Sequence, residues 1–280
     1  MASGLDAPHP HPNGTGNGLF RLSLLTLTVM LVWNFWLQRE LRRERDRAEA
    51  ERHFWIVGHR NSPALERTES FLALVRAGNR EWRGAHLQEL HLPGIALTNA
   101  PLAEADFRGS DFQRADLRGA LLNGALLGKV DLADANLAGA DCSGANFLQA
   151  RLPDADLRRT NLRGAVLEQV FAPKALLVTA DLADAQLLMA DFTDANLSGA
   201  DLTGANLEAA IFRHAALDLA RLSEANLKDA DFTDANWWRA RGLNRANLGY
   251  LMQRFAPTAL ASVELHEDFA KWRKELVVPQ

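Results

Sequence analysis

Aspartates are the residues of this chain whose type and spacing most suggest chemistry, because paired carboxylates can perform general acid–base catalysis. Asp106, Asp111 and Asp116 lie five residues apart, and Asp181 and Asp201 lie twenty residues apart. Each one precedes a large apolar residue, in a position where a short acceptor serves turn backbone and water. This placement favours a structural role for these aspartates over catalysis.

The other residue types offer no further catalytic or binding set. The eight histidines are scattered, and no glycine-rich phosphate-binding motif is present. Cys142 is the single cysteine, so neither an intramolecular disulfide nor a cysteine-rich zinc site can form. We therefore expect no catalytic residue, no metal ligand and no cofactor, and we expect that the protein is not an enzyme. A cluster of Trp237, Trp238, Arg239 and Arg241 leaves an enzyme site open, although an end cap is favoured there.

The segment that carries most of these residues follows a period of five. From Leu87 to Trp237 every fifth residue is apolar without a shift of frame, which gives thirty-one central positions. Alanine lies two residues before twenty-five of them, and Asp or Asn most often lies between the two. A period of five fits neither the 3.6-residue turn of an α-helix nor the two-residue alternation of a strand.

A chain that turns a corner every five residues can keep both the central residue and the alanine inside. Four such sides close a square coil of twenty residues, and the other three residues of each side point outward. Coils then stack through backbone hydrogen bonds, and at about 4.8 Å per coil the rod would be roughly 37 Å long. Leu, Phe and Ala fill the interior, so no substrate-sized cavity is expected. Cys142 occupies a central position and is interpreted as a small buried apolar residue.

The repeated Ala-(Asp/Asn)-Leu pattern, as in Ala-Asn-Leu at 135–137, resembles the pentapeptide repeat family over residues 85–241. The resemblance implies an all-β solenoid, a right-handed quadrilateral β-helix of pentapeptide repeats in which each unit contacts only its neighbours. We assign residues 85–250 to this β-helix. At 170–173 a small residue takes a central position, which leaves a local bulge open.

The residues before the repeat predict a membrane anchor. Residues 1–18 are rich in Pro and Gly and predict a disordered tail. Residues 19–38 carry no charge apart from Arg21, are rich in Leu, Val and Trp, and predict an N-terminal transmembrane helix near the minimum length, with a cleaved signal peptide or a buried helix as the alternatives. Arginines after this segment outnumber those before it, so the positive-inside rule predicts a single-pass membrane protein with a cytoplasmic repeat domain.

Helical caps are expected at both ends of the β-helix, because an open solenoid exposes unpaired strand edges. Residues 39–84 comprise a charged helical stalk and an N-terminal capping helix at 63–77, for which Ser62 can serve as N-cap. Residues 251–280 comprise a C-terminal capping helix whose apolar residues lie along one side.

One face of the predicted rod carries a candidate interaction surface. Residues twenty apart stack in neighbouring coils, so apolar residues in outward positions of four consecutive coils fall on the same face. We name these residues the apolar stripe: Leu126, Leu148, Val166, Leu188 and Met189. A contiguous apolar patch on a protein surface often marks an interface, so the stripe predicts contact with a partner or with a second copy of the chain.

Charge narrows the classes of function. A formal net charge of −4 and a pI near 6.1 remove the phosphate attraction on which general nucleic-acid binders depend, so no direct nucleic-acid partner is expected. The leading hypothesis is a non-catalytic, membrane-anchored scaffold or protein–protein interaction module, as an accessory or assembly subunit of a membrane complex. The family supplies an alternative, because some pentapeptide repeat proteins imitate duplex DNA, bind type II topoisomerases and protect gyrase. Residues 85–250 have a net charge of −7, which is only mildly acidic for such mimicry.

Overall fold

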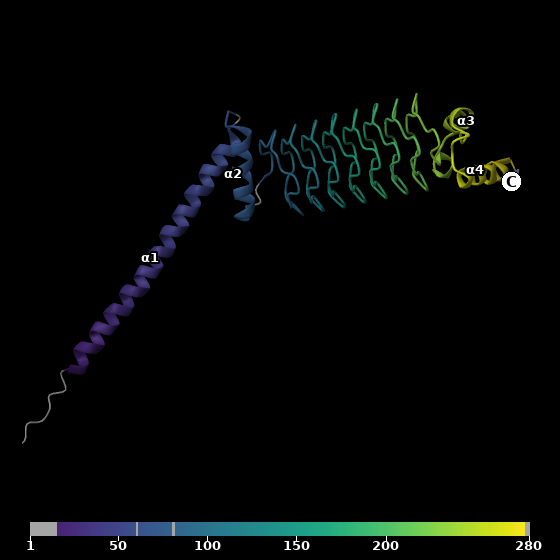
Figure 1. The fold of residues 1–280 in the computed structure, drawn as a ribbon. Helices are drawn as coiled ribbons and strands as arrows, with labels where there is room; N and C mark the ends of the chain where they lie inside the picture. Colours follow the sequence, from purple (N-terminus) through teal and green to yellow (C-terminus); the bar gives the residue numbers. More distant parts are fainter. Residues whose placement is uncertain (1–15, 60, 80–81, 278–280) are drawn as a thin grey trace, which may run out of the picture. The chain divides into compact units, whose positions relative to one another are not determined.

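The computed structural model of the chain describes residues 16–59, 61–79 and 82–277, with four α-helices, one short 3₁₀ helix and a long stack of coils in those ranges (Figure 1). The chain divides into two units, residues 1–52 and 53–280.

The first unit consists of most of helix α1, which spans Gly16–Gly58. Residues 1–15 of the predicted disordered tail lie outside the described residues. The last three residues of that prediction, 16–18, are helical instead, because α1 begins at Gly16. Charged pairs one turn apart stabilise the middle of the helix, with Arg43 and Glu40 at 3.4 Å. Within the part of the chain that the structure describes, no helix has the length and apolar character needed to cross a membrane.

The second unit contains the predicted square coils. Parallel β-bridges join residues twenty apart, from His86 with Asp106 to Arg221 with Arg241. Along each side the central residue and the residue two before it are buried, as for Leu137 and Ala135, each no more than 1% exposed. The period of five, the twenty-residue coil and the inward alanine are therefore confirmed.

Corners of the coil need a left-handed backbone once in every five residues. Glycine fills many of these corners because it has no Cβ to clash, and Asp134 with φ 58° shows that other residues also adopt the conformation. Gly119 has a second constraint, since a Cβ there would come within 2.3 Å of Oδ1 of Asn99 in the coil before. Glycine at this corner therefore leaves room for the side chain of the corner residue in the neighbouring coil.

Phenylalanines on one side of the coil form a stacked column inside the rod. The ring centroids of Phe192 and Phe212 lie 5.7 Å apart, and those of Phe212 and Phe232 lie 5.0 Å apart. One coil earlier, Ala172 takes the same position. The backbone ladder is continuous there, since the N–H of Ala172 donates to the backbone oxygen of Asp191 at 2.8 Å. No bulge forms at 170–173, since Pro173 sits where only its carbonyl is needed, as the acceptor for the N–H of Asp154.

Helix α2, Ala64–Arg76, covers the first coil as predicted, but it begins one residue later than expected. Pro63 is the N-cap and makes no side-chain capping bond, so the capping role assigned to Ser62 is wrong. Phe71 and Leu74 are buried, and the ring of Phe71 packs 4.5 Å from that of Trp82. This aromatic contact attaches the helix to the solenoid.

At the other end the coils stop earlier than residue 250. The last bridge ends at Arg241, and helix α3, Arg245–Arg254, begins soon after it. The side chain of Asn244 accepts a hydrogen bond from the N–H of Asn247, which starts a helix where the sequence shows one more Ala-Asn-Leu motif. The predicted single capping helix at 251–280 is instead the end of α3 followed by helix α4, Val263–Val277.

The phenylalanine column provides a test of this packing. Phe212→Ala is expected to lower the free energy of unfolding by about 3–5 kcal/mol, because it leaves a cavity between two stacked rings. Phe171→Ala is the matched control, since Phe171 lies on the outside of the same rod and is 40% exposed. Denaturant unfolding followed by circular dichroism measures both variants. Equal losses of stability would contradict the assignment of Phe212 to the core.

Candidate interaction surface

The regularly spaced aspartates act as acceptors at the turns, as predicted. Oδ1 of Asp131 accepts the N–H of Ala133 at 3.0 Å, and the same bond recurs along the rod. Several carboxylates also pair with an arginine two residues later. The Arg118 guanidinium, hydrogen-bonded to Asp116, lowers the pKa of that carboxyl to about 2. Such carboxylates are fully ionised near neutral pH and have no proton to donate in general acid catalysis.

Cys142 lies in the interior and is 0% exposed. Burial raises the pKa of its thiol well above the usual range, so the nucleophilic thiolate is scarcely populated. Within the described residues no group of three or more His, Cys, Asp or Glu side chains is arranged to hold a metal ion.

The structure brings the residues of the apolar stripe onto one face, in two neighbouring rows. Leu126 and Val166 share the row of bridged residues, where Asn146 lies between them. Leu148 and Leu188 share the next row, at positions directly after the central residues Phe147 and Leu187. The stripe therefore exists, but polar residues alternate with its leucines and valine.

Exposure differs along the stripe. Leu148 is 38% exposed and Met189 is 56% exposed, whereas Leu126, Val166 and Leu188 are half-buried. Met189 also occupies a left-handed corner with φ 56°, a conformation that a long apolar side chain rarely adopts. Among the five residues of the apolar stripe, Leu148 and Met189 thus expose the most side-chain surface to a partner.

Sequence reasoning missed other exposed apolar residues on the rod. Leu121, Phe171 and Leu176 are 47%, 40% and 38% exposed, and each takes the position that Asp or Asn usually fills. That substitution was readable in the repeat and could have identified them. Leu219, 54% exposed, stands at a corner in the same way as Met189.

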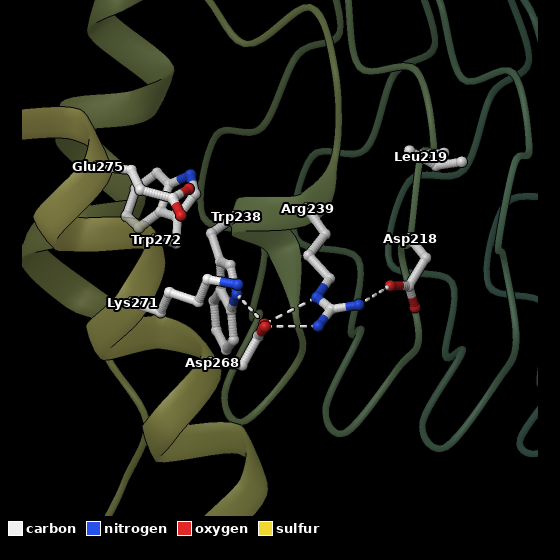
Figure 2. Close-up of a pocket in the computed structure, with 8 residues that line it drawn as sticks. All are labelled: Asp218, Leu219, Trp238, Arg239, Asp268, Lys271, Trp272 and Glu275. Carbon is white, nitrogen blue, oxygen red and sulfur yellow. Dashed lines mark hydrogen bonds and ion pairs between the residues drawn. The ribbon is translucent and has the colours of Figure 1, made fainter.

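The aromatic and arginine cluster at the C-terminal end joins the last coil to α4. Figure 2 shows Arg239, from the 3₁₀ helix η1 at Trp237–Arg239, lying between two carboxylates. Its NH1 donates to Asp218 at 2.8 Å, and its Nε donates to Asp268 of α4 at 2.7 Å. Nε1 of Trp238 donates to the same Asp268 carboxylate at 2.7 Å.

A cavity of about 460 Å³ adjoins this cluster, lined in part by Leu219, Lys271 and Trp272. Arg239 is already paired with Asp268 and Asp218, whose hydrogen bonds raise the pKa of the guanidinium, and Arg239 in turn lowers the pKa of Asp268. The cluster therefore acts as a clamp for the end cap. Arg241 stands apart from the clamp, in the last β-bridge of the ladder.

Comparison with known families identifies the repeat. The sequence profile of the family described as pentapeptide repeats matches at residues 83–119, 92–128, 131–169, 160–199 and 200–239. These segments cover more than half of the chain. The chain belongs to the pentapeptide repeat family. The family implies the right-handed β-helix that was expected from the sequence.

Solved structures of other pentapeptide repeat proteins match the same region. HetL from Nostoc sp. strain PCC 7120, involved in regulating heterocyst differentiation, is 28% identical and has a TM-score of 0.28, covering 60% of this chain and 95% of its own. A protein of the Arabidopsis thaliana thylakoid lumen is 27% identical with a TM-score of 0.22, covering 44% and 68%. QnrB1, a plasmid-mediated fluoroquinolone resistance protein, is 21% identical with a TM-score of 0.31, covering 66% and 95%. A search of curated protein sequences found no relative.

The clamp at the end of this pentapeptide repeat rod leads to a prediction on pH. Asp268→Asn is expected to destabilise the docking of α4 by about 1–2 kcal/mol at pH 7, because it removes charge-assisted bonds to Arg239 and Trp238. The folded-state pKa of Asp268 is lowered, so its contribution is present above the unfolded pKa of about 3.9 and is lost as pH falls through the folded value. Hydrogen exchange of the α4 amides measures the effect.

The control for this prediction is Asp154→Asn, since Asp154 is exposed at a corner and forms no ion pair within the described residues. It should leave the exchange of α4 unchanged at every pH. An Asp268→Asn defect of equal size at acid and neutral pH would contradict the ionic clamp.

Proposed function

We propose that this pentapeptide repeat protein is a non-catalytic scaffold or protein–protein interaction module. Pentapeptide repeat proteins are in general interaction modules. The observation that carries the proposal is the filled interior, in which central residues and alanines are buried from Leu87 to Trp237. Recognition must then use the outer faces, where exposed apolar residues interrupt the regular polar positions.

The apolar stripe is the surface that we assign to a protein partner or to a second copy of the chain. Leu148 and Met189 offer exposed apolar area, and Leu126, Val166 and Leu188 extend it across neighbouring coils. Because coils are tied by a continuous backbone ladder, these side chains hold a fixed spacing. A rigid array of this kind loses little conformational entropy when it binds.

We further propose that residues 19–38 attach the protein to a membrane, so that it serves as an accessory or assembly subunit of a membrane complex. In residues 30–38 of α1, several apolar side chains are exposed, among them Met30, Trp33 and Phe35 at 69%, 63% and 72%. Exposed apolar side chains are stabilised when a nonpolar environment replaces water around them. The arginines that follow favour a cytoplasmic repeat domain.

Imitation of duplex DNA for binding to a type II topoisomerase is the second candidate that the family suggests. Such mimicry needs a dense array of free negative charge. On this rod many carboxylates are paired with cations, for example Asp231 with Arg213 and Glu208 with Lys228, both at 2.6 Å. We therefore rank it below the interaction module.

Charged substitutions in the stripe test the proposed surface. Leu148→Glu combined with Leu188→Glu is expected to abolish co-purification of a stoichiometric partner, or to reduce the oligomer to a single chain, because an interface cannot bury unpaired carboxylates. Affinity purification from gently solubilised membranes, with oligomer size measured by light scattering, gives the result. Leu121→Glu is the matched control, as Leu121 is similarly exposed but lies on another face.

If the stripe variant retained both its partners and its oligomer size, the stripe would not be the interface. Recovery of a topoisomerase with the wild-type protein would instead favour the DNA-mimic candidate.

The anchor is tested separately from the surface. The full chain is expected to stay in the membrane fraction after alkaline carbonate washing, whereas a shortened chain beginning at Ser62 is expected in the supernatant. A reporter fused to the C-terminus should be active only if it functions in the cytoplasm. Release of the full chain by carbonate would contradict the anchor, and a reporter active only outside the cytoplasm would reverse the orientation.

A further inference from the structure

A buried arginine without a paired carboxylate lies where helix α2 packs on the first coils. Arg67 is 4% exposed, and within the described residues its side chain makes a single hydrogen bond, from NH2 to the backbone oxygen of Gln88. Its Nε atom is buried and has no hydrogen-bond partner among the residues that the structure describes. Burial removes water from the guanidinium without replacing all of its hydrogen bonds, which is an unfavourable arrangement for a cation.

A cavity adjoins this arginine. It has a volume of about 370 Å³ and is lined by Arg67, Gln88, Glu89 and Arg108. The first of these comes from α2 and the others from the first two coils, so the cavity exists only because the capping helix sits on the solenoid. It is large enough for one small organic molecule or the end of a peptide.

Gln88 contributes a second unsatisfied group. Its Nε2 donates to Oδ2 of Asp106, which fixes the orientation of the amide, and its Oε1 is buried without a partner in the described part of the chain. Arg108 holds the same Asp106 carboxylate with bonds of 2.9 and 2.7 Å, so this arginine is already neutralised. The unmet demands of the cavity are therefore a negative group for Arg67 and a hydrogen-bond donor for Gln88.

A carboxylate meets the first demand, because its two oxygens match the planar guanidinium. An N–H on the α-carbon beside that carboxylate meets the second. Glu89 also lines the cavity, and its carboxylate repels a dianion such as phosphate more strongly than a monoanion. We propose that this cavity binds a carboxylate with an N–H donor on its α-carbon, the chemistry of a peptide C-terminus or of a free α-amino acid. The site is separate from the apolar stripe and does not depend on the proposed function.

A bridging water would satisfy Nε of Arg67 and Oε1 of Gln88 without any ligand. Water would leave Arg67 without a directly paired carboxylate, whereas a bound carboxylate pairs with its guanidinium. The two cases differ in whether a carboxylate binds saturably.

Isothermal titration of the full-length protein in detergent micelles tests the proposal with four probes. N-acetylglycine represents a peptide C-terminus, glycine a free amino acid, acetate a carboxylate without the donor, and inorganic phosphate a different oxyanion. We expect saturable one-to-one binding of N-acetylglycine or glycine, with acetate about tenfold weaker because it lacks one hydrogen bond. The tighter of the first two probes distinguishes a protein C-terminus from a free amino acid.

Two variants locate the binding. Arg67→Gln is expected to abolish binding of every carboxylate probe. Gln88→Met removes the acceptor and should reduce the affinity for N-acetylglycine to that for acetate, while the affinity for acetate stays unchanged. Arg114→Gln is the matched control, because Arg114 is exposed at a corner away from the cavity, and it should bind all probes as the wild type does.

Absence of saturable binding of both N-acetylglycine and glycine would overturn the proposal and leave the bridging water as the explanation. Equal affinities for N-acetylglycine and acetate would overturn the role of Gln88, and tighter binding of phosphate would overturn the choice of ligand. If Arg67→Gln fails to fold, the Gln88→Met comparison decides, because a general loss of structure would weaken acetate binding as well.

Discussion

The backbone ladder between residues twenty apart is the interaction on which the rest of the structure depends. The backbone N–H and C=O groups of each side form hydrogen bonds with the neighbouring coils. For example, the N–H of Leu137 donates to the backbone oxygen of Asp156 at 2.7 Å. This register can persist only if every side contributes the same length and the same inward pair of residues. The interior then has room for one large and one small side chain per side, and Ala172 beside Phe192 shows how the size of neighbours is balanced.

A solenoid of this kind satisfies its backbone everywhere except at its two ends. The chain covers the first coil with α2 and the last with α3 and α4, and aromatic packing attaches the cover at both ends. At the N-terminal end the cover is an aromatic contact between Phe71 and Trp82, together with the buried Arg67. At the C-terminal end Trp238 packs 4.9 Å from Phe269 of α4, and an ionic clamp is added, in which Arg239 joins Asp218 to Asp268. Polar groups concentrate at these ends because α-helix and coil present mismatched backbones there.

Because the interior is used up by packing, recognition is left to the surface and to the end caps. The outward positions of each side are free to vary without disturbing the ladder, so a residue such as Leu148 or Met189 can be exposed at little cost to the fold. The same rigidity fixes distances between such residues across coils. The regularly spaced aspartates accordingly accept hydrogen bonds from turn N–H groups and form no catalytic pair. The cavities beside Arg67 and Arg239 lie at the two ends, where helices pack on the coils.

The sequence by itself determined the coil, because a period of five with a large and a small residue admits one inward pair per side, and it also placed the apolar stripe on one face. It did not determine where the coils end, since the motif Ala246-Asn247-Leu248 looks like a repeat yet begins a helix once Asn244 caps it. The repeat also contained Asn146 between Leu126 and Val166, and apolar residues at 121 and 171 where Asp or Asn is usual. Only the structure gave the exposed fraction of each side chain, because exposure depends on neighbours in other coils. Only the tertiary structure placed Arg67 over Gln88, twenty-one residues away, since a helix packed on a solenoid follows no repeat that could be read along the chain.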